Sequence, residues 1–125
     1  MQLLTNAQFK AQIFDYENKQ EWENQNDKPV LIDFYADWCG PCTMLNPILE
    51  NMEKHYGDQI DFFKVDADQE RELVQAFGVQ SLPSLLFIPM EGQPQMAKGA
   101  VQPDKLKQAI EDILLKKSET GDYKQ

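Results

Sequence analysis

An almost unbroken apolar run, residues 30–35, leads directly into Trp-Cys-Gly-Pro-Cys at positions 38–42. A strand with apolar side chains on both faces is typical of the centre of a parallel sheet, which is covered by helices on both sides. Pro41 suits the first turn of a helix, where its missing N–H costs nothing. The run is therefore predicted to be a central strand that enters a helix through the two cysteines, in a chain of the α/β class.

Cys39 and Cys42 are the only cysteines of the chain. At the opening turn of a helix, unpaired backbone N–H groups and the helix dipole favour a thiolate. Three residues later, the helical repeat brings Cys42 under the same turn, angled toward the protein and close enough to close a small disulfide ring. The spacing predicts thiol–disulfide exchange, with Cys39 as the nucleophile and Cys42 as the resolving thiol.

A structural disulfide is one alternative for this pair. Such a bond would enclose only four residues, for which loop entropy gives roughly 2 kcal/mol, against about 3 kcal/mol for a loop of fifteen residues. In a reducing cytosol, a lone cysteine pair also favours a catalytic over a structural role. A catalytic pair is the preferred interpretation.

Metal sites are disfavoured by the number and the spacing of the candidate ligands. A structural zinc site needs about four ligands, whereas the chain offers two cysteines and the single histidine, His55. The alternate acids Asp66, Asp68 and Glu70 resemble the opening of a calcium loop, but Arg71 stands where such a loop needs glycine. Capping of a helix N-terminus explains these acids better, so no metal is predicted.

The length of 125 residues and a hydrophobic content of 42% suit one domain with a real core. We expect a single domain over 1–115, in which 1–28 form an N-terminal helix and a polar loop, followed by a tail over 116–125. Periodicity and turn residues predict a helix opened by the capping pair Thr5 and Gln8, a helix from Pro41 to Gly57, a strand over 60–65, a short helix over 69–77, strands over 84–88 and 95–101, and a last helix from Pro103.

The net charge of −9 argues against nucleic acid and anionic membrane surfaces as partners. No apolar stretch approaches the roughly 20 residues that span a bilayer, and the first residues lack the basic start and apolar core of a leader. We therefore expect a cytoplasmic protein, with a monomer as the default. A leader removed before the sequence was recorded would place it in the periplasm instead.

The order of elements around the cysteine pair resembles that of the thioredoxin family, from about residue 29 to 115. The resemblance rests on the Trp-Cys-Gly-Pro-Cys motif, Asp33 six residues upstream, Lys64, the pair Leu82-Pro83, Gly92 and Gly99. It implies a thioredoxin fold, with a central mixed β-sheet flanked by helices on both faces. The longer front portion looks like that of an extended bacterial subgroup. Tyr35 departs from the family, which often has tryptophan there, and Thr43 replaces a common lysine.

The resemblance also implies roles for individual residues. Asp33 would accept the proton of Cys42, through water, with Lys64 close enough to modulate it; a merely tolerated polar residue is the alternative. Pro83 would follow a cis peptide bond, so that the backbone before it meets an extended substrate, whereas an ordinary trans proline would only start a strand. Trp38 would offer an apolar surface beside the dithiol, unless it only fills the core. The remaining substrate-binding positions implied are Gly40, Pro41, Leu82 and Gly99.

The implied activity is reduction of protein disulfides through a mixed disulfide. The Gly-Pro pair between the cysteines adds no charge that would stabilise the reduced form, which favours electron donation to substrates. No cofactor is expected to be bound apart from the redox-active disulfide, and electrons would come from NADPH through a separate flavoprotein, thioredoxin reductase. The partners expected are this reductase and proteins that contain disulfides. Two alternatives stay open: a periplasmic protein of cytochrome maturation or oxidative folding, and a non-catalytic thioredoxin-like binding module.

Overall fold

The computed structural model of the chain describes residues 1–116. Its elements are β1 (Gln2–Leu3), α1 (Asn6–Gln12), β2 (Val30–Tyr35), α2 (Gly40–Tyr56), β3 (Asp61–Asp66), α3 (Arg71–Ala76), β4 (Ser84–Ile88), β5 (Gln95–Lys98), α4 (Pro103–Ala109) and the π-helical turn η1 (Ile110–Leu114). The predicted tail, 116–125, lies outside the described residues except for Lys116.

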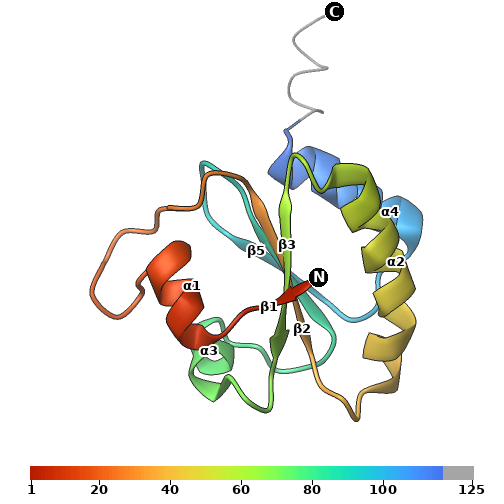
Figure 1. The fold of residues 1–125 in the computed structure, drawn as a ribbon, viewed down its shortest axis with the longest axis horizontal. Coiled ribbons are helices and arrows are strands. Elements are labelled where there is room, and N and C mark those ends of the chain that lie inside the picture. Colours follow the sequence, from red (N-terminus) through yellow and green to blue (C-terminus); the bar gives the residue numbers. More distant parts are fainter. Residues whose placement is uncertain (117–125) are drawn as a thin grey trace, which may run out of the picture.

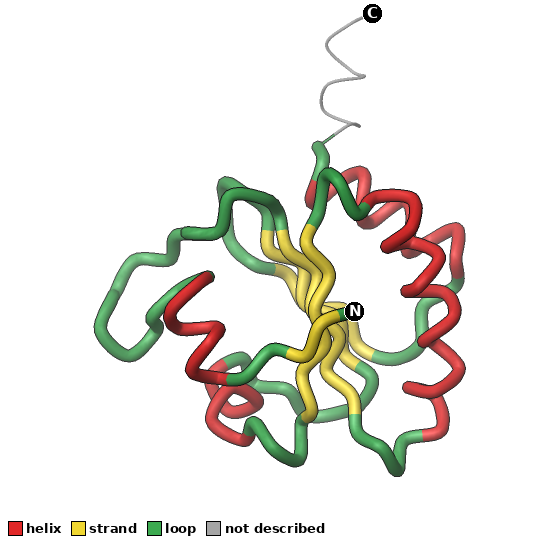
Figure 2. Tube along the Cα trace, viewed as in Figure 1, coloured by secondary structure: helices red, strands yellow, loops and turns green. Residues whose placement is uncertain are grey.

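The five strands form one mixed sheet in the order β1-β3-β2-β4-β5. Strands β1, β2 and β3 run parallel, while β4 is antiparallel to both β2 and β5. Helices α1 and α3 cover one face of the sheet and α2 and α4 cover the other (Figure 1), so that the strands form a layer between the helices (Figure 2). The predicted fold class and the central place of β2 are confirmed.

Each face of the sheet carries its own apolar core. Phe9 of α1 and Ile32 of β2 belong to one core, and Leu31 of β2 belongs to the other, together with Leu45 and Leu49 of α2. Because successive side chains of a strand point to opposite faces, every second residue from Leu31 onward faces α2. This alternation directs the side chains of Asp33 and Tyr35 toward the α2 side of the sheet.

The N-terminal segment is anchored to the core at several points. The capping box predicted at the start of α1 is present, because Thr5 and Gln8 bond reciprocally. Within the polar loop, the ring of Trp22 lies 4.6 Å from that of Phe14 and packs against the core. Strand β1 is not predicted from the sequence, because two residues are too few to show an alternating pattern.

The ends of the helices follow the glycine signals only in part. Gly78 follows α3 with a φ of 63°, a left-handed conformation that glycine adopts without steric cost. Gly57 ends α2 in an ordinary right-handed conformation, and a Cβ there would lie 2.6 Å from the carbonyl oxygen of Glu53. Glycine is therefore needed at position 57 because the Glu53 carbonyl oxygen lies too close for a Cβ atom.

Among the helices of 1–116, none has the length and apolarity needed to cross a membrane.

Candidate active site

The cysteine pair stands where β2 leads into α2. Cys39 is the N-cap residue of α2 in an extended conformation, and Pro41 occupies the first turn of the helix. A disulfide joins Cys39 and Cys42, whose Cα atoms are 5.3 Å apart, and the Sγ of Cys39 accepts a hydrogen bond of 3.2 Å from the backbone N–H of Cys42. The helix therefore directs an unpaired N–H group at the Cys39 sulfur, as the sequence predicts, and that contact stabilises a negative charge there.

The two cysteines differ little in exposure. Cys39 is 4% exposed and Cys42 is 2% exposed, and the two form a buried cluster with Ala36, against which Tyr35 and Leu82 pack. The sequence predicts that the second thiol is turned further into the protein than the first. In the disulfide form the difference in exposure is small, because the bonded sulfurs are buried in the same cluster of side chains. The two residues therefore differ only in their positions relative to the start of the helix.

Asp33 lies in the middle of β2 and is 1% exposed. Neither of its carboxyl oxygens has a hydrogen-bond partner among the described residues. Burial raises the pKa of Asp33 to about 6, against the opposing effect of the positive charge of Lys64. The carboxyl group is thus buried, and it titrates close to neutral pH.

Lys64 is the neighbour of Asp33 across the β2–β3 pair. Its ammonium nitrogen lies 5.5 Å from the centre of the Tyr35 ring, a distance at which a cation is attracted to an aromatic face. Tyr35 in turn packs against the buried cluster of Ala36, Cys39 and Cys42. From the sequence, Tyr35 is only a departure from the family, because its contact with Lys64 depends on the register of two separate strands.

The loop before β4 meets the loop after β5 beside the disulfide. The Leu82–Pro83 peptide bond is cis, as the resemblance implied, and Leu82 packs against the cysteines. The backbone N–H of Gly99 donates a hydrogen bond of 2.8 Å to the carbonyl oxygen of Pro83, and Gly99 has a φ of 85°, which favours glycine. Residues far apart in sequence therefore share one side of the dithiol.

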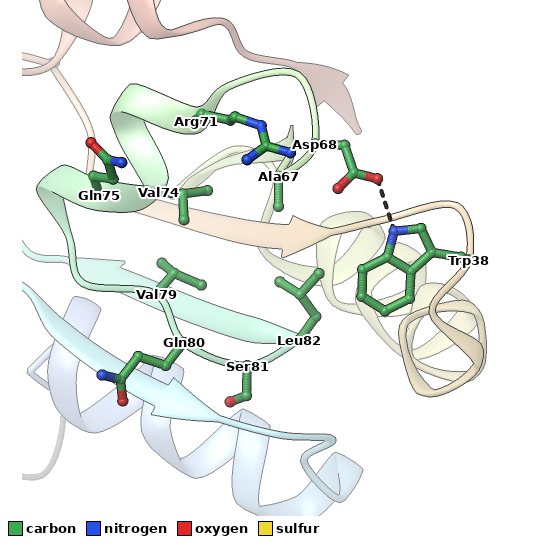
Figure 3. A pocket seen from close by; sticks show the side chains of 10 residues that line it. All are labelled: Trp38, Ala67, Asp68, Arg71, Val74, Gln75, Val79, Gln80, Ser81 and Leu82. Atoms are coloured by element: carbon green, nitrogen blue, oxygen red, sulfur yellow. Dashed lines mark hydrogen bonds between the residues drawn. The ribbon is translucent and has the colours of Figure 1, made fainter.

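Trp38 is 71% exposed, so that it does not serve as a core residue. Its indole N–H donates a hydrogen bond of 2.8 Å to a carboxylate oxygen of Asp68, and its ring borders a groove of about 300 Å³ (Figure 3). The groove is also lined by Ala67, Arg71, Val74, Gln75, Val79, Gln80, Ser81 and Leu82. An apolar hollow with a polar rim thus begins next to the cysteine pair.

The acids Asp66, Asp68 and Glu70, from the end of β3 to the start of α3, do not cap a helix by their side chains, which corrects the capping interpretation. Helix α3 has no side-chain cap bond. Asp68 binds Trp38, Glu70 accepts a hydrogen bond from the backbone N–H of Asn6, and Asp66 accepts bonds from backbone N–H groups just after it. Within 1–116, no three side chains of His, Cys, Asp or Glu gather where they could hold a metal ion.

Comparison with known proteins agrees with this geometry. The family model for thioredoxin matches residues 2–112. The chain belongs to the thioredoxin family. A thioredoxin from Borreliella burgdorferi is 50% identical over 110 residues, which make up 88% of this chain and 94% of that protein. The solved structure of Malassezia sympodialis thioredoxin is 33% identical with a TM-score of 0.69, covering 89% of this chain and 87% of that one.

Chloroplastic thioredoxin z has the same fold, with a TM-score of 0.72 at 21% identity, over 90% of this chain and 95% of that one. Family membership, together with the joined cysteines, establishes the activity. The protein is a thiol–disulfide oxidoreductase that reduces protein disulfides by dithiol–disulfide exchange. Its redox-active group is the Cys39–Cys42 disulfide.

Proposed function

We propose that Cys39 is the nucleophile and Cys42 the resolving thiol. The Cys39 thiolate attacks one sulfur of a substrate disulfide, whose S–S bond breaks, and the departing substrate sulfur takes up a proton. Cys42 then loses its proton and attacks the Cys39 sulfur, which releases the second substrate thiol and forms the Cys39–Cys42 disulfide. The observation that carries this order is the hydrogen bond from the Cys42 N–H to the Cys39 sulfur at the start of α2.

Asp33 is the group that accepts the proton of Cys42, through water, and Lys64 modulates it. A general base works best when its pKa lies near the working pH. Burial raises the pKa of Asp33 to about 6, and no hydrogen bond to another described residue occupies its oxygens. Replacing Asp33 by Asn should slow release from the mixed disulfide by up to about 100-fold, the lower end of what general bases contribute. Release at an unchanged rate would remove this role.

The substrate lies as an extended segment across the surface beside the dithiol. Gly40 and Pro41 are exposed at the start of α2, and Trp38 presents its ring next to them. Pro83 itself is buried, so at this point the substrate contacts the backbone of Leu82. The N–H and C=O groups of Leu82 form no hydrogen bond within residues 1–116. Such free groups suit pairing with an added strand, and Gly99 borders the same loop.

Trapping of the mixed disulfide tests the two cysteine roles. Cys42→Ser should accumulate a covalent complex with a disulfide substrate such as insulin, because the resolving attack is lost. Cys39→Ser, which differs only in the position of the lost thiol, should form no such complex and should not turn over. Accumulation of the complex in Cys39→Ser alone would show that the roles are inverted.

Family membership also supports the electron source, the partners and the compartment. Electrons pass from NADPH through a separate flavoprotein, thioredoxin reductase, to the Cys39–Cys42 disulfide, and from the dithiol to disulfide-containing proteins. The protein acts as a monomer in the cytoplasm. Reduction of the purified protein by NADPH and the reductase of the same organism tests this route. Failure of that reduction, combined with a strongly oxidising potential, would instead support a periplasmic role in oxidative folding.

A further inference from the structure

Three polar side chains, those of Asp33, Tyr35 and Lys64, lie on the α2-facing side of the sheet. Asp33 and Tyr35 are two residues apart on β2 and share a face, and Lys64 is the partner of Asp33 on β3. The Lys64 ammonium lies over the Tyr35 ring, 5.5 Å from its centre. No ion pair joins Lys64 to Asp33 within 4.0 Å in the described part of the chain.

In this arrangement the Lys64 ammonium acts on the Asp33 carboxyl group from a distance, without direct contact. A carboxylate that is buried and without hydrogen bonds gains most from direct contact with a cation. Asp33 is in that position, and the cation that acts on it is Lys64, its partner in the strand register. That ammonium lies over the Tyr35 ring, 5.5 Å from its centre, where an aromatic face attracts a cation.

We propose that Tyr35 is a positioning residue for the proton-transfer step, whose ring keeps the Lys64 ammonium out of contact with the Asp33 carboxyl group. A direct pair would fix the carboxylate in its charged form and weaken it as a proton acceptor. The ring thereby preserves a group that can gain and lose a proton near neutral pH. This inference rests on the proposed role of Asp33.

The other charged groups around these side chains do not provide an alternative holder for Lys64. Asp66 faces Tyr35 across the strand pair and accepts backbone hydrogen bonds, and Asp37 follows β2. Neither forms an ion pair with Lys64 within 4.0 Å in the described chain. Burial raises the pKa of Tyr35, and the neighbouring acids raise it further, so the ring stays neutral. From α2, Cys39 and Cys42 are joined in a disulfide, so neither carries a charge in the oxidised protein.

The test follows the Asp33 carboxyl carbon by NMR during a pH titration of the oxidised full-length protein. In Tyr35→Leu the ammonium is released and can reach the carboxylate, so the pKa of Asp33 should fall by about one pH unit. In Tyr35→Phe the ring remains, and the pKa should stay near its wild-type value. In a Lys64→Met background, Tyr35→Leu should cause no such fall, because the cation is absent.

An unchanged Asp33 titration in Tyr35→Leu, or an equal fall in the Lys64→Met background, would overturn the proposal. Tyr35→Trp keeps the test decisive if the leucine variant does not fold. Tryptophan attracts cations most strongly among the aromatic residues, so the pKa of Asp33 should not fall in that variant. A fall would contradict the proposal. Because the titration is measured without turnover, it separates this inference from the catalytic role of Asp33, which the kinetics of Asp33→Asn test.

Discussion

At the scale of single residues, Asp33 links the stability of the protein to its chemistry. The folded state holds the carboxyl proton more firmly than the unfolded chain, since burial raises the pKa from 3.8 to about 6. Between these two values the folded protein binds more protons than the unfolded one, so the free energy of unfolding falls as the pH rises. The destabilisation caused by burying the charged carboxylate of Asp33 is therefore complete above about pH 6 and disappears below about pH 4.

Asp33→Asn should therefore stabilise the protein at neutral pH. A shift from 3.8 to about 6 corresponds to about 3 kcal/mol in the free energy of unfolding. Urea unfolding of the oxidised protein should show a gain of this order at about pH 7.5 and little difference at about pH 3.5. An equal effect at both pH values would mean that the substitution acts through packing and not through the charge.

Asp68→Ala should weaken substrate binding without changing the chemical step. The substitution removes the hydrogen bond that orients the exposed ring of Trp38. We expect KM for a protein disulfide to rise about twofold to tenfold, with kcat preserved. Asp104→Ala, which removes an exposed carboxylate in the first turn of α4, is the control for the change in charge. If both variants behave alike, the contact with Trp38 has no part in binding.

The residues of the site could be predicted from the sequence to different extents. Cys39 and Cys42 follow from local spacing alone, and Asp33 stands out because a carboxylate is costly within an apolar strand. The contact between Asp68 and Trp38 joins positions 30 residues apart. In the sequence, Asp68 and the acids near it are also consistent with capping of a helix N-terminus, so the pattern does not indicate the contact with Trp38. Long-range contacts of this kind depend on how β3 and β2 are aligned, which no local pattern encodes.

At the scale of elements, apolar runs, helical periodicity and turn residues predicted the longer helices and strands. The elements that the sequence did not predict, β1 and η1, are short or irregular. The strand β1 exists only through its pairing with β3. The turn η1 continues α4 with a bond from the N–H of Leu115 to the carbonyl of Ile110, five residues back. The buried positions 106, 110 and 114 fit an α-helix as well as this wider turn, so the sequence does not distinguish the two.

Helix α1 should contribute to stability and not to the reactivity of the thiol. Phe9 is fully buried in the core on the side of the sheet opposite α2. Phe9→Ala should lower the free energy of unfolding by about 3–5 kcal/mol. Thr5→Ala, which removes only the helix cap, should lower it by about 1 kcal/mol. Denaturant unfolding measures both, and an altered pKa of Cys39 in either variant would contradict the separation of the two faces.

At the scale of the whole molecule, 21 acidic against 12 basic side chains give a net charge of −9. A uniform excess of one sign steers oppositely charged partners and repels those of like charge, and salt screens both effects. The charge thus influences which substrates meet the dithiol fastest, while the local contacts around Cys39 set its reactivity.

Two peptide disulfides that differ only in net charge should respond in opposite ways to salt. Raising the ionic strength to about 0.15 M, where the screening length is about 8 Å, should lower kcat/KM for the cationic peptide and raise it for the anionic one. A neutral peptide of the same length is the control. A common direction for all three peptides would exclude long-range steering.

The central claim is that the start of α2 makes Cys39 an anion more readily than an ordinary thiol. Titration of the reduced protein, followed by thiolate absorbance and compared with Cys39→Ser and Cys42→Ser, measures it most directly. We predict that the Cys39 thiol has a pKa below the ordinary value of about 8.5. Ionisation of Cys39 no easier than that of cysteine in a short unstructured peptide would contradict the account.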